Sequence, residues 1–577
     1  MAGHLQNKGL EELRSARRQS RTLFWIVGVF SFFANLLMLT GPIYMLQVYD
    51  RVLGSRSEET LVALTLLVVF LYGTMGVLDY TRGRVMARVG ARFQATLDKR
   101  VFDAMIRRSS QAPDPTAQTG LADLESIQRL ISSPVLLAGF DIPWTPFFLA
   151  GIALFHPWLG MLAIAGGVLL VMITFVNQAL SRGPTTKANI SSHHANLMSE
   201  EIRTEAELIQ AMGMRSAAFE RWKLARDASL VETVAATDVG GSFTSLTKTL
   251  RMLLQSAMLG LGAYLVLLNE ITPGAMIAGS ILLGRALAPI ELAIGQWAMV
   301  QRATKGWSSL GELLSKMPPE DPRTDLPKPK AKLDVQSLTV VPPGDTRAQL
   351  RTVSFRVEPG QAVGVIGPSG AGKSTLARAL TGVWRPAGGS VRLDGAALDQ
   401  YAPDVLGRHI GYLPQRVQLF EGTIAQNIAR LAQQPDAQKV VAAAKLAAAH
   451  DMIVKLPDGY DTRVSAGGGR LSGGQMQRIA LARALYDSPV IVILDEPNSN
   501  LDNEGSQALN SAIRALKEAG KSVLIMAHRP AAIQECDTLL VLEGGMRSAF
   551  GPKDQVMREM VANHKELKKS AAMGGVQ

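Results

Sequence analysis

The 577-residue sequence predicts two parts: an α-helical domain with six membrane-spanning helices and, after it, an α/β domain. Long apolar runs, most of them without charge, occur as far as Trp297, and a helix of ~20 residues is enough to cross the ~30 Å apolar core of a bilayer. From Leu333 onward, short apolar strands alternate with helical segments, which is the pattern of α/β folds. A hydrophobic content of 47% and a mean hydropathy of +0.13 are also high for a soluble protein.

Six apolar runs are the predicted membrane spans. The third and fourth share the uncharged stretch from Ile142 to Ser181, which His156-Pro157-Trp158 divides into a helical hairpin with a polar tip. The first arm of this hairpin begins near Ser132. In order, the runs are 22–49, 60–78, 132–155, 159–181, 252–269 and 271–297.

Three ionisable residues lie inside these runs: Asp141, Arg285 and Glu291. A charge at the centre of a span costs about 2.5 to 3.5 kcal/mol on insertion scales, so each needs a partner or polar surroundings. Two interpretations stay open: a polar path or gate, or an ion pair that locks helices together, with Asp141 and Arg285 as candidate partners. Pro143 and Pro146 are expected to kink or widen the third span.

Basic residues between the spans predict the orientation of the chain. They are concentrated before the first span, between spans two and three, and between spans four and five, whereas the opposite connections carry only Arg51 and Arg56. The positive-inside rule therefore places the amino terminus, both long connections and the α/β domain in the cytoplasm. A cleaved signal peptide is the rival interpretation of the first run. That run is much longer than the ~7 to 15 residues of a signal-peptide core, so we expect an anchor.

The two long cytoplasmic connections are expected to be helical. Stretches 82–107 and 195–231 contain little Gly or Pro and are predicted to continue the membrane helices into the cytoplasm. They either couple the membrane domain to the α/β domain or form solvated helices without a coupling role. After the sixth span, the Pro-rich segment 317–331 marks a domain boundary.

Charge and cysteine content argue against a nucleic-acid-binding protein and against a protein stabilised by internal disulfides. The net charge of +11 comes from bases beside apolar runs, where membrane insertion explains them, and no stripe of bases and aromatic residues indicates nucleic-acid binding. Cys536 is the only cysteine, so the chain has no internal disulfide, and a small buried side chain is its simplest role.

A phosphate-binding loop lies at the start of the α/β domain. The β-like run from Ala362 to Ile366 is followed by a Gly-x-x-x-x-Gly-Lys-Ser pattern and then by a helix from Thr375 to Leu380. Lys373 is expected to reach the β- and γ-phosphates of ATP, and the Ser374 hydroxyl to bind Mg²⁺. The predicted phosphate-binding residues are Gly367, Pro368, Ser369, Gly370, Ala371, Gly372, Lys373, Ser374 and Thr375.

A second strand ends in two acids. The unbroken apolar run from Val490 to Leu494 is typical of a buried parallel strand, and ligands bind at the carboxyl ends of such strands. Asp495 is therefore expected to hold Mg²⁺, directly or through water. Glu496 is expected to orient or deprotonate the water that attacks the γ-phosphate.

The segment Leu471-Ser472-Gly473-Gly474-Gln475 completes a resemblance to the nucleotide-binding domain of ABC transporters, an α/β fold with an added helical subdomain. This resemblance implies that Ser472, Gly473, Gly474 and Gln475 bind the ATP of a second copy, so that the chain works as a homodimer. It also implies that Gln415 contacts Mg²⁺ and that His528 contacts the γ-phosphate. Residues 499–502 resemble the loop that crosses the dimer interface.

Some residues depart from the family pattern. Residues 340–343, Val-Val-Pro-Pro, contain no aromatic side chain where exporters of this family usually stack adenine, so adenine is expected to pack on aliphatic carbon. Met476 stands where the family often has Arg. Glu496 and His528 are both present, so we expect real ATP hydrolysis. The predicted division is a transmembrane domain at 1–316, a linker at 317–331, a nucleotide-binding domain at 332–555 and a basic tail at 556–577.

Segments of the membrane half extend the resemblance to the type I secretion ATPases, most closely the protease and haemophore exporters. These segments are 41–57, 140–146 and 156–160, together with 496–502 in the ATPase. The resemblance implies a Gram-negative inner-membrane protein that works with a periplasmic adaptor and an outer-membrane channel. Its cargo would be an unfolded polypeptide with a carboxy-terminal signal, and a peptidase-like amino-terminal domain is not expected. An exporter of lipids or peptides, and a regulatory protein that turns ATP over poorly, are the alternatives.

Overall fold

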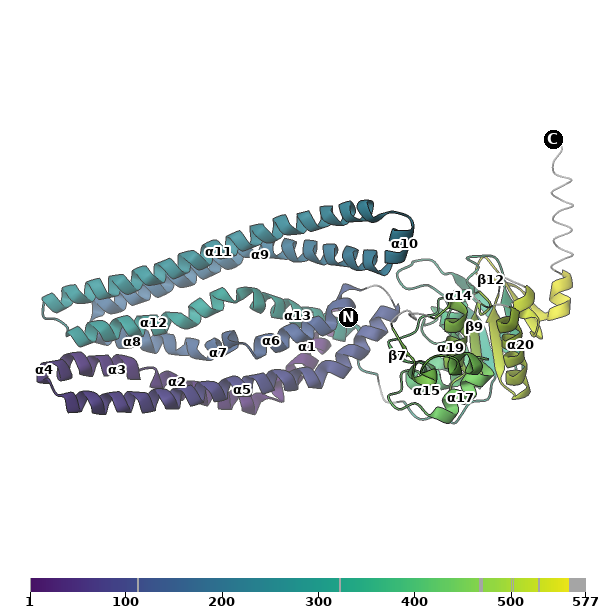
Figure 1. Cartoon of the computed structure of the whole chain (residues 1–577), viewed down its shortest axis with the longest axis horizontal. Coiled ribbons are helices and arrows are strands. Elements are labelled where there is room, and N and C mark those ends of the chain that lie inside the picture. The colour runs from purple at the N-terminus through teal and green to yellow at the C-terminus, as the bar shows by residue number, and fades with distance from the viewer. Residues whose placement is uncertain are drawn as a thin grey trace, which may run out of the picture. The chain divides into compact units, whose positions relative to one another are not determined.

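The computed structural model describes residues 2–111, 114–320, 323–465, 471–499, 501, 503–527 and 530–559. Its contacts divide the chain into two compact units. The first unit contains residues 1–108 and 114–318, and the secondary structure of its described residues is all helical. The second contains residues 109–113 and everything from Pro319 onward (Figure 1).

The described part of the first unit has six helical segments long and apolar enough to cross a membrane, which confirms the predicted number of spans. Two of these segments consist of several shorter helices, and the other four are single helices (Figure 1). The segments are Arg21–Ser55 (α2 Arg21–Leu37, α3 Thr40–Gln47, η1 Val48–Val52, α4 Leu53–Ser55), Glu58–Gln111 (α5), Pro134–Phe155 (α7 Pro134–Asp141, η2 Ile142–Trp144, α8 Thr145–Phe155), Pro157–Thr204 (α9), Arg215–Leu267 (α11) and Pro273–Gly295 (α12).

Helices α1 (Ala2–Arg18), α6 (Pro115–Ile131) and α13 (Trp297–Lys316) pack together at the cytoplasmic end predicted for this unit. Their shared core includes Leu13, Leu124 and Leu310, which are fully buried. Helices α1 and α13 approach closely, because a Cβ at Gly9 would lie 2.2 Å from the carbonyl oxygen of Gly311. The chain therefore ties its first helix to its last helix before the linker.

The predicted helical extensions are present, but one of them is not a single helix. Helix α5 continues without a break through 82–107, as expected. The stretch 195–231, in contrast, reverses direction: α9 ends at Thr204, the short α10 spans Ala206–Ala211, and α11 begins at Arg215. Gly213 has φ +67°, a left-handed conformation that glycine adopts without strain, and this permits the turn. Figure 1 shows α9 and α11 packed along each other with α10 at the turn.

Prolines interrupt the third span where the sequence places them. Helix α7 ends at Asp141, and the 3₁₀ turn η2 joins it to α8. Proline has no N–H to donate and its ring clashes with the preceding turn, so Pro143 and Pro146 disfavour one continuous α-helix here. The span begins at Pro134, two residues after the predicted start.

The ionisable residues of the spans have partners other than those considered from the sequence. Asp141 pairs with Arg82 of α5, with Arg82 Nη1 2.8 Å from Asp141 Oδ1. Glu291 pairs with Arg251 of α11 at 3.3 Å. Arg285 is exposed and forms no ion pair with any residue that the structure describes. The candidate pair of Asp141 with Arg285 is therefore wrong. Arg82 and Arg251, at the ends of neighbouring apolar runs, reach into the spans and pair with Asp141 and Glu291.

The second unit is built on two larger sheets. A six-stranded sheet has the order β12-β11-β3-β10-β9-β6, in which only the edge strand β12 is antiparallel. A four-stranded antiparallel sheet has the order β2-β1-β4-β5. The strands are β1 Leu333–Val340, β2 Leu350–Val357, β3 Ala362–Ile366, β4 Gly388–Leu393, β5 Ala396–Ala397, β6 Ile410–Leu413, β7 Gly422–Thr423, β8 Arg463–Val464, β9 Ile491–Asp495, β10 Ser522–Met526, β11 Thr538–Glu543 and β12 Met546–Pro552.

Helices cover the parallel sheet and form a separate helical group. The two hydrophobic layers of this unit are divided by the sheet, since alternate residues of β9 and β10 belong to different clusters. One layer includes the helical group α16–α19, which is the helical subdomain that the resemblance implied. The helices are α14 Lys373–Leu380, α15 Pro403–His409, α16 Ile424–Ile428, α17 Ala437–Leu446, α18 His450–Val454, α19 Gly473–Leu485 and α20 Asn503–Glu518.

Candidate nucleotide-binding site

The motifs converge because they follow neighbouring parallel strands. In the sheet, β10 lies between β3 and β9, and β6 lies on the other side of β9. The strand ends are in register, with Met526 opposite both Val365 and Asp495. Ligands of such sheets bind beyond the carboxyl ends of the strands. The phosphate-binding loop after β3, the acids at the end of β9 and Gln415 after β6 therefore lie along one edge.

The phosphate-binding loop, residues 367–374, joins β3 to α14. Two of its glycines are required by the backbone. A Cβ at Gly367 would lie 2.2 Å from the carbonyl oxygen of Leu542, and Gly372 has φ +98°. Pro368, Ser369 and Gly370 are exposed just ahead of the helix. The amino-terminal end of a helix, with its backbone N–H groups and the positive end of its dipole, suits this edge to phosphate.

Lys373 is buried, and its amine folds back over the loop. Its Nζ donates to the carbonyl oxygens of Gly367 at 2.8 Å and Pro368 at 2.9 Å. Burial lowers the pKa of Lys373, and the negative charges of Glu496 and Asp495 oppose that shift. The amine thus contacts the phosphate-binding loop and lies close enough to the two acids to feel their charge.

Asp495 is 2% exposed, and its surroundings fit a hard cation. Burial raises the pKa of Asp495, while a hydrogen bond from the Ser374 hydroxyl lowers it. Its Oδ1 is buried and has no hydrogen-bond partner among the described residues. Mg²⁺ prefers oxygen ligands and usually takes one or two from protein while keeping water and phosphate oxygens. A buried carboxylate oxygen beside a hydroxyl fits that requirement.

Glu496 is held in a strained backbone conformation. Its φ is +52°, in the left-handed region that is uncommon for a residue with a side chain. Its N–H donates to the carbonyl oxygen of Met526 at 3.0 Å, which fixes it to the neighbouring strand β10. Gln415 Nε2 donates to Glu496 Oε2 at 3.1 Å, leaving the amide oxygen of Gln415 for another ligand. The structure therefore brings together the predicted acid and the predicted glutamine.

The Ser472–Gln475 segment forms the start of helix α19. Ser472 is its N-cap, and the capping box is reciprocal: Gln475 N donates to Ser472 Oγ at 3.2 Å, and Ser472 N donates to Gln475 Oε1 at 2.9 Å. Ser472 is exposed, and Gly473, Gly474 and Gln475 are half-buried. Among the described residues, the side chains of Ser472 and Gln475 hydrogen-bond only within this capping box. The helix end is available to a ligand from outside the chain.

Two supporting glutamines, Gln477 and Gln349, were not predicted from the sequence. Gln477, 1% exposed, donates to the carbonyl oxygen of Pro497 at 2.6 Å and so holds the turn after Glu496. Thr375 Oγ1 donates to Gln349 Oε1 at 2.7 Å, which links α14 to the residue before β2. Nothing in the sequence separates these glutamines from surface glutamines, because their roles depend on long-range contacts.

Some predicted residues lie outside the part that the structure describes. His528, Asn500 and Asp502 are among them, as is the tail from residue 560. The segment 340–343, where adenine is expected to pack, begins at the last residue of β1; Val340 and Pro342 are buried, while Val341 and Pro343 are half-buried.

A phosphate-binding α/β domain attached to six membrane spans defines the class of ATP-driven membrane transporters. The family model for the ABC transporter domain matches residues 350–499, and that for the ABC transporter transmembrane region matches residues 24–287. The type I secretion system ATP-binding protein PrsD of Rhizobium meliloti (strain 1021) is 44% identical over 95% of this chain and 94% of its own length. The chain therefore belongs to the ABC transporters, and within them to the type I secretion ATP-binding proteins.

More distant similarities agree with this assignment. The leukotoxin translocation ATP-binding protein LktB of Mannheimia haemolytica is 30% identical over 91% of this chain and 75% of its own length. A solved structure of a bacterial Atm1-family ABC exporter with ATP bound has a TM-score of 0.77 at 24% identity, over 96% of this chain and 98% of that chain. This last similarity shows the fold alone and confirms the predicted architecture.

Proposed function

We propose that this membrane protein is the ATPase and permease of a type I secretion system, which exports protein cargo at the expense of ATP. The observation that carries the proposal is the 44% identity to a type I secretion ATP-binding protein over 95% of the chain. The proposed cargo is an unfolded polypeptide with a carboxy-terminal signal. The proposed location is the inner membrane, with the amino terminus and ATPase in the cytoplasm and with a periplasmic adaptor and an outer-membrane channel as partners.

The residues of the site have distinct proposed roles in hydrolysis. The loop 367–375 and the Lys373 amine bind the phosphates of ATP. Ser374, Asp495 and the Gln415 amide oxygen hold Mg²⁺, which offsets phosphate charge when bound. Glu496 orients the attacking water and accepts its proton, and the Gln415 amide keeps the carboxylate in place through the 3.1 Å hydrogen bond.

Replacing Glu496 tests this assignment. In the purified dimer, Glu496→Gln is expected to lower ATP hydrolysis by at least about 100-fold, the lower range for losing a general base, with ATP binding retained. Glu518→Gln is the matched control, because Glu518 is exposed at the end of α20. Secretion of cargo with adaptor and channel present should fail in the first variant and persist in the second. Hydrolysis at the wild-type rate by Glu496→Gln would remove Glu496 from the mechanism.

We also propose a homodimer in which Ser472, Gly473, Gly474 and Gln475 of one chain complete the ATP site of the other. Ser472 is exposed and its hydroxyl bonds only within its own helix end among the described residues, which supports a ligand supplied by a second chain. Lys373→Ala removes a chain's own phosphate contact, and Ser472→Arg blocks the site that this helix end faces.

Heterodimers distinguish ATP sites that are shared between two chains from sites that each chain builds alone. With Lys373→Ala in one chain and Ser472→Arg in the other, both changes fall on one shared site, so one nucleotide per dimer should remain trapped. With both changes in the same chain, each shared site loses one element and no nucleotide should be trapped. The reverse pattern would show that each chain builds its site alone.

A further inference from the structure

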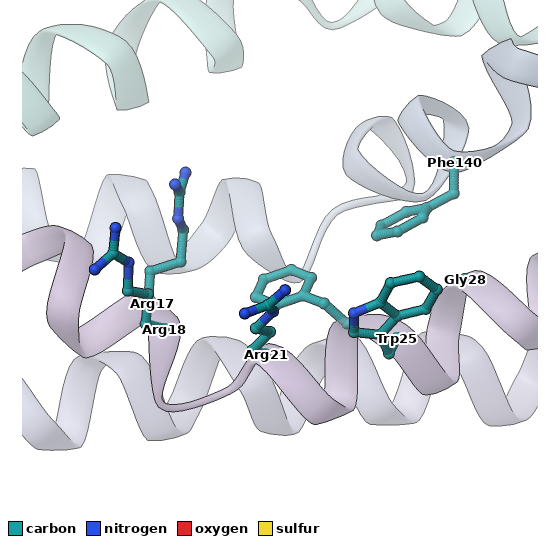
Figure 2. Close-up of a pocket in the computed structure, with 7 residues that line it drawn as sticks. Arg17, Arg18, Arg21, Trp25, Gly28 and Phe140 are labelled. Atoms are coloured by element: carbon teal, nitrogen blue, oxygen red, sulfur yellow. The ribbon is translucent and has the colours of Figure 1, made fainter.

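A pocket unrelated to the ATPase lies at the junction of α1, α2 and α7. Its volume is about 550 Å³, within the ~300–1,000 Å³ typical of ligand pockets. Figure 2 shows Arg17 and Arg18 at the end of α1, Arg21 at the start of α2, and Phe140 of α7 projecting toward Trp25. The complete lining is Arg17, Arg18, Arg21, Phe24, Trp25, Gly28 and Phe140.

The pocket has one cationic end and one apolar end. Arg17, Arg18 and Arg21 are exposed, the lining includes no acid, and none of the three forms an ion pair with a residue the structure describes. Glu12, an acid of the same helix, is already paired with Arg100 at 3.0 Å. Arg17 lies 5.8 Å from the Trp307 ring, a cation–π contact that leaves its charge uncompensated.

The position of the pocket selects a lipid over a soluble ligand. Arg21 immediately precedes the first uncharged run, so the three guanidinium groups lie at headgroup level. The N-cap Ser20 makes no side-chain hydrogen bond to α2, so the first N–H groups of that helix remain available to an anion. Trp25 is 66% exposed and faces the apolar end, where acyl chains pack against aromatic rings.

We propose that this pocket binds one anionic phospholipid of the leaflet on the amino-terminal side, with its phosphate between the three arginines and its acyl chains along Trp25 and Phe140. Helix α1 packs on α13, the last helix before the linker. The bound lipid therefore anchors α1 and supports the helix that leads to the ATPase.

The experiment uses the full homodimer in phosphatidylcholine nanodiscs with increasing fractions of brominated phosphatidylglycerol. Bromine quenches nearby tryptophan, and the Trp25 signal is the difference between the wild type and Trp25→Phe. Each basic residue near an anionic surface is worth about fivefold in binding, so three arginines give on the order of 100-fold. We expect half-maximal quenching at a much lower fraction of brominated phosphatidylglycerol than of brominated phosphatidylcholine.

Variants distinguish lipid binding in the pocket from a general effect of surface charge. Arg17→Ala/Arg18→Ala/Arg21→Ala should bring the phosphatidylglycerol curve to that of phosphatidylcholine, and Arg21→Ala alone, should the triple variant not fold, should shift it about fivefold. The control Arg88→Ala/Arg92→Ala/Arg182→Ala removes the same charge from exposed positions outside the pocket and should match the wild type.

Three results would overturn the proposal. Equal quenching by the two lipids would show that the pocket has no preference for anionic lipid. Equal shifts in the pocket and control variants would show a surface-charge effect without a site. Relief of quenching by soluble glycerol phosphate would show a site for a free anion, so we expect none.

Discussion

The buried ion pair of Arg82 and Asp141 allows a quantitative test of the membrane unit. The side chains are 9% and 12% exposed. Asp141 Oδ1 accepts from Arg82 Nη1 at 2.8 Å and from Asn35 Nδ2 at 2.7 Å, so α2, α5 and α7 meet at one carboxylate. Asp79 Oδ1 lies 3.1 Å from Arg82 Nε, but without hydrogen-bond geometry, so it replaces Asp141 poorly.

Removing one partner of a buried pair costs about 3–5 kcal/mol, because the other charge stays buried without a partner. We expect Arg82→Met to lower the free energy of unfolding by about this amount, since it leaves Asp141 with the Asn35 amide alone. Asp141→Asn should cost about 3 kcal/mol, at the low end, because Asp79 still faces Arg82. The double change Arg82→Met/Asp141→Leu should recover to within about 1 kcal/mol of the wild type, since an apolar pair needs no compensation.

The assay is unfolding of the purified protein in mixed micelles titrated with SDS, followed by far-UV circular dichroism. Arg88→Met on the same helix is the control and should unfold like the wild type, because Arg88 is exposed. The exchange Asp141→Arg/Arg285→Asp should not restore stability. A double variant as unstable as the sum of the single variants would refute the pairing of Arg82 with Asp141.

Two further predictions concern residues outside the spans. Hydrogen bonds from Thr116, and then from Arg108 and Lys316, hold the pKa of Asp114 well below its usual range. The charged Asp114 therefore stabilises the fold fully above the unfolded pKa of about 3.9, and this contribution is lost as pH falls below that value. The difference in melting temperature between the wild type and Asp114→Asn should accordingly shrink from pH 7 to pH 3. A difference that stays constant with pH would contradict this. Cys536 is 4% exposed, and burial raises the pKa of its thiol to about 12. Maleimide should therefore label Cys536 only after denaturation. Rapid labelling of the native dimer would show that the thiol is accessible.

Local patterns were enough to predict the spans and the chemical motifs. A bilayer core imposes the length of apolar runs, and a phosphate-binding loop requires its glycines and lysine next to one another in the chain. The six spans, the strand Ala362–Ile366 and the acids at the end of β9 follow from such patterns. The break of the third span also follows, because proline acts on its own helix.

Contacts between distant segments needed the tertiary structure. The partner of Asp141 is 59 residues away, and no sequence pattern separates Arg82 from the other bases that follow the second span. The reversal at Gly213 brings α9 and α11 together along their lengths, and no local pattern in 195–231 indicates that packing. The hydrogen bond between Gln415 and Glu496 and the buried role of Gln477 likewise depend on the order of the strands and on α19.

The sequence by itself determined the parts of this protein: six spans, a phosphate-binding loop, two acids and the Ser472–Gln475 segment. Each of these parts is encoded by neighbouring residues. The tertiary structure decided which charges neutralise one another in the membrane unit and where three arginines meet an apolar wall. Burial and ion pairing depend on separations of a few ångströms between segments far apart in the chain, and spacing along a sequence carries no measure of those distances.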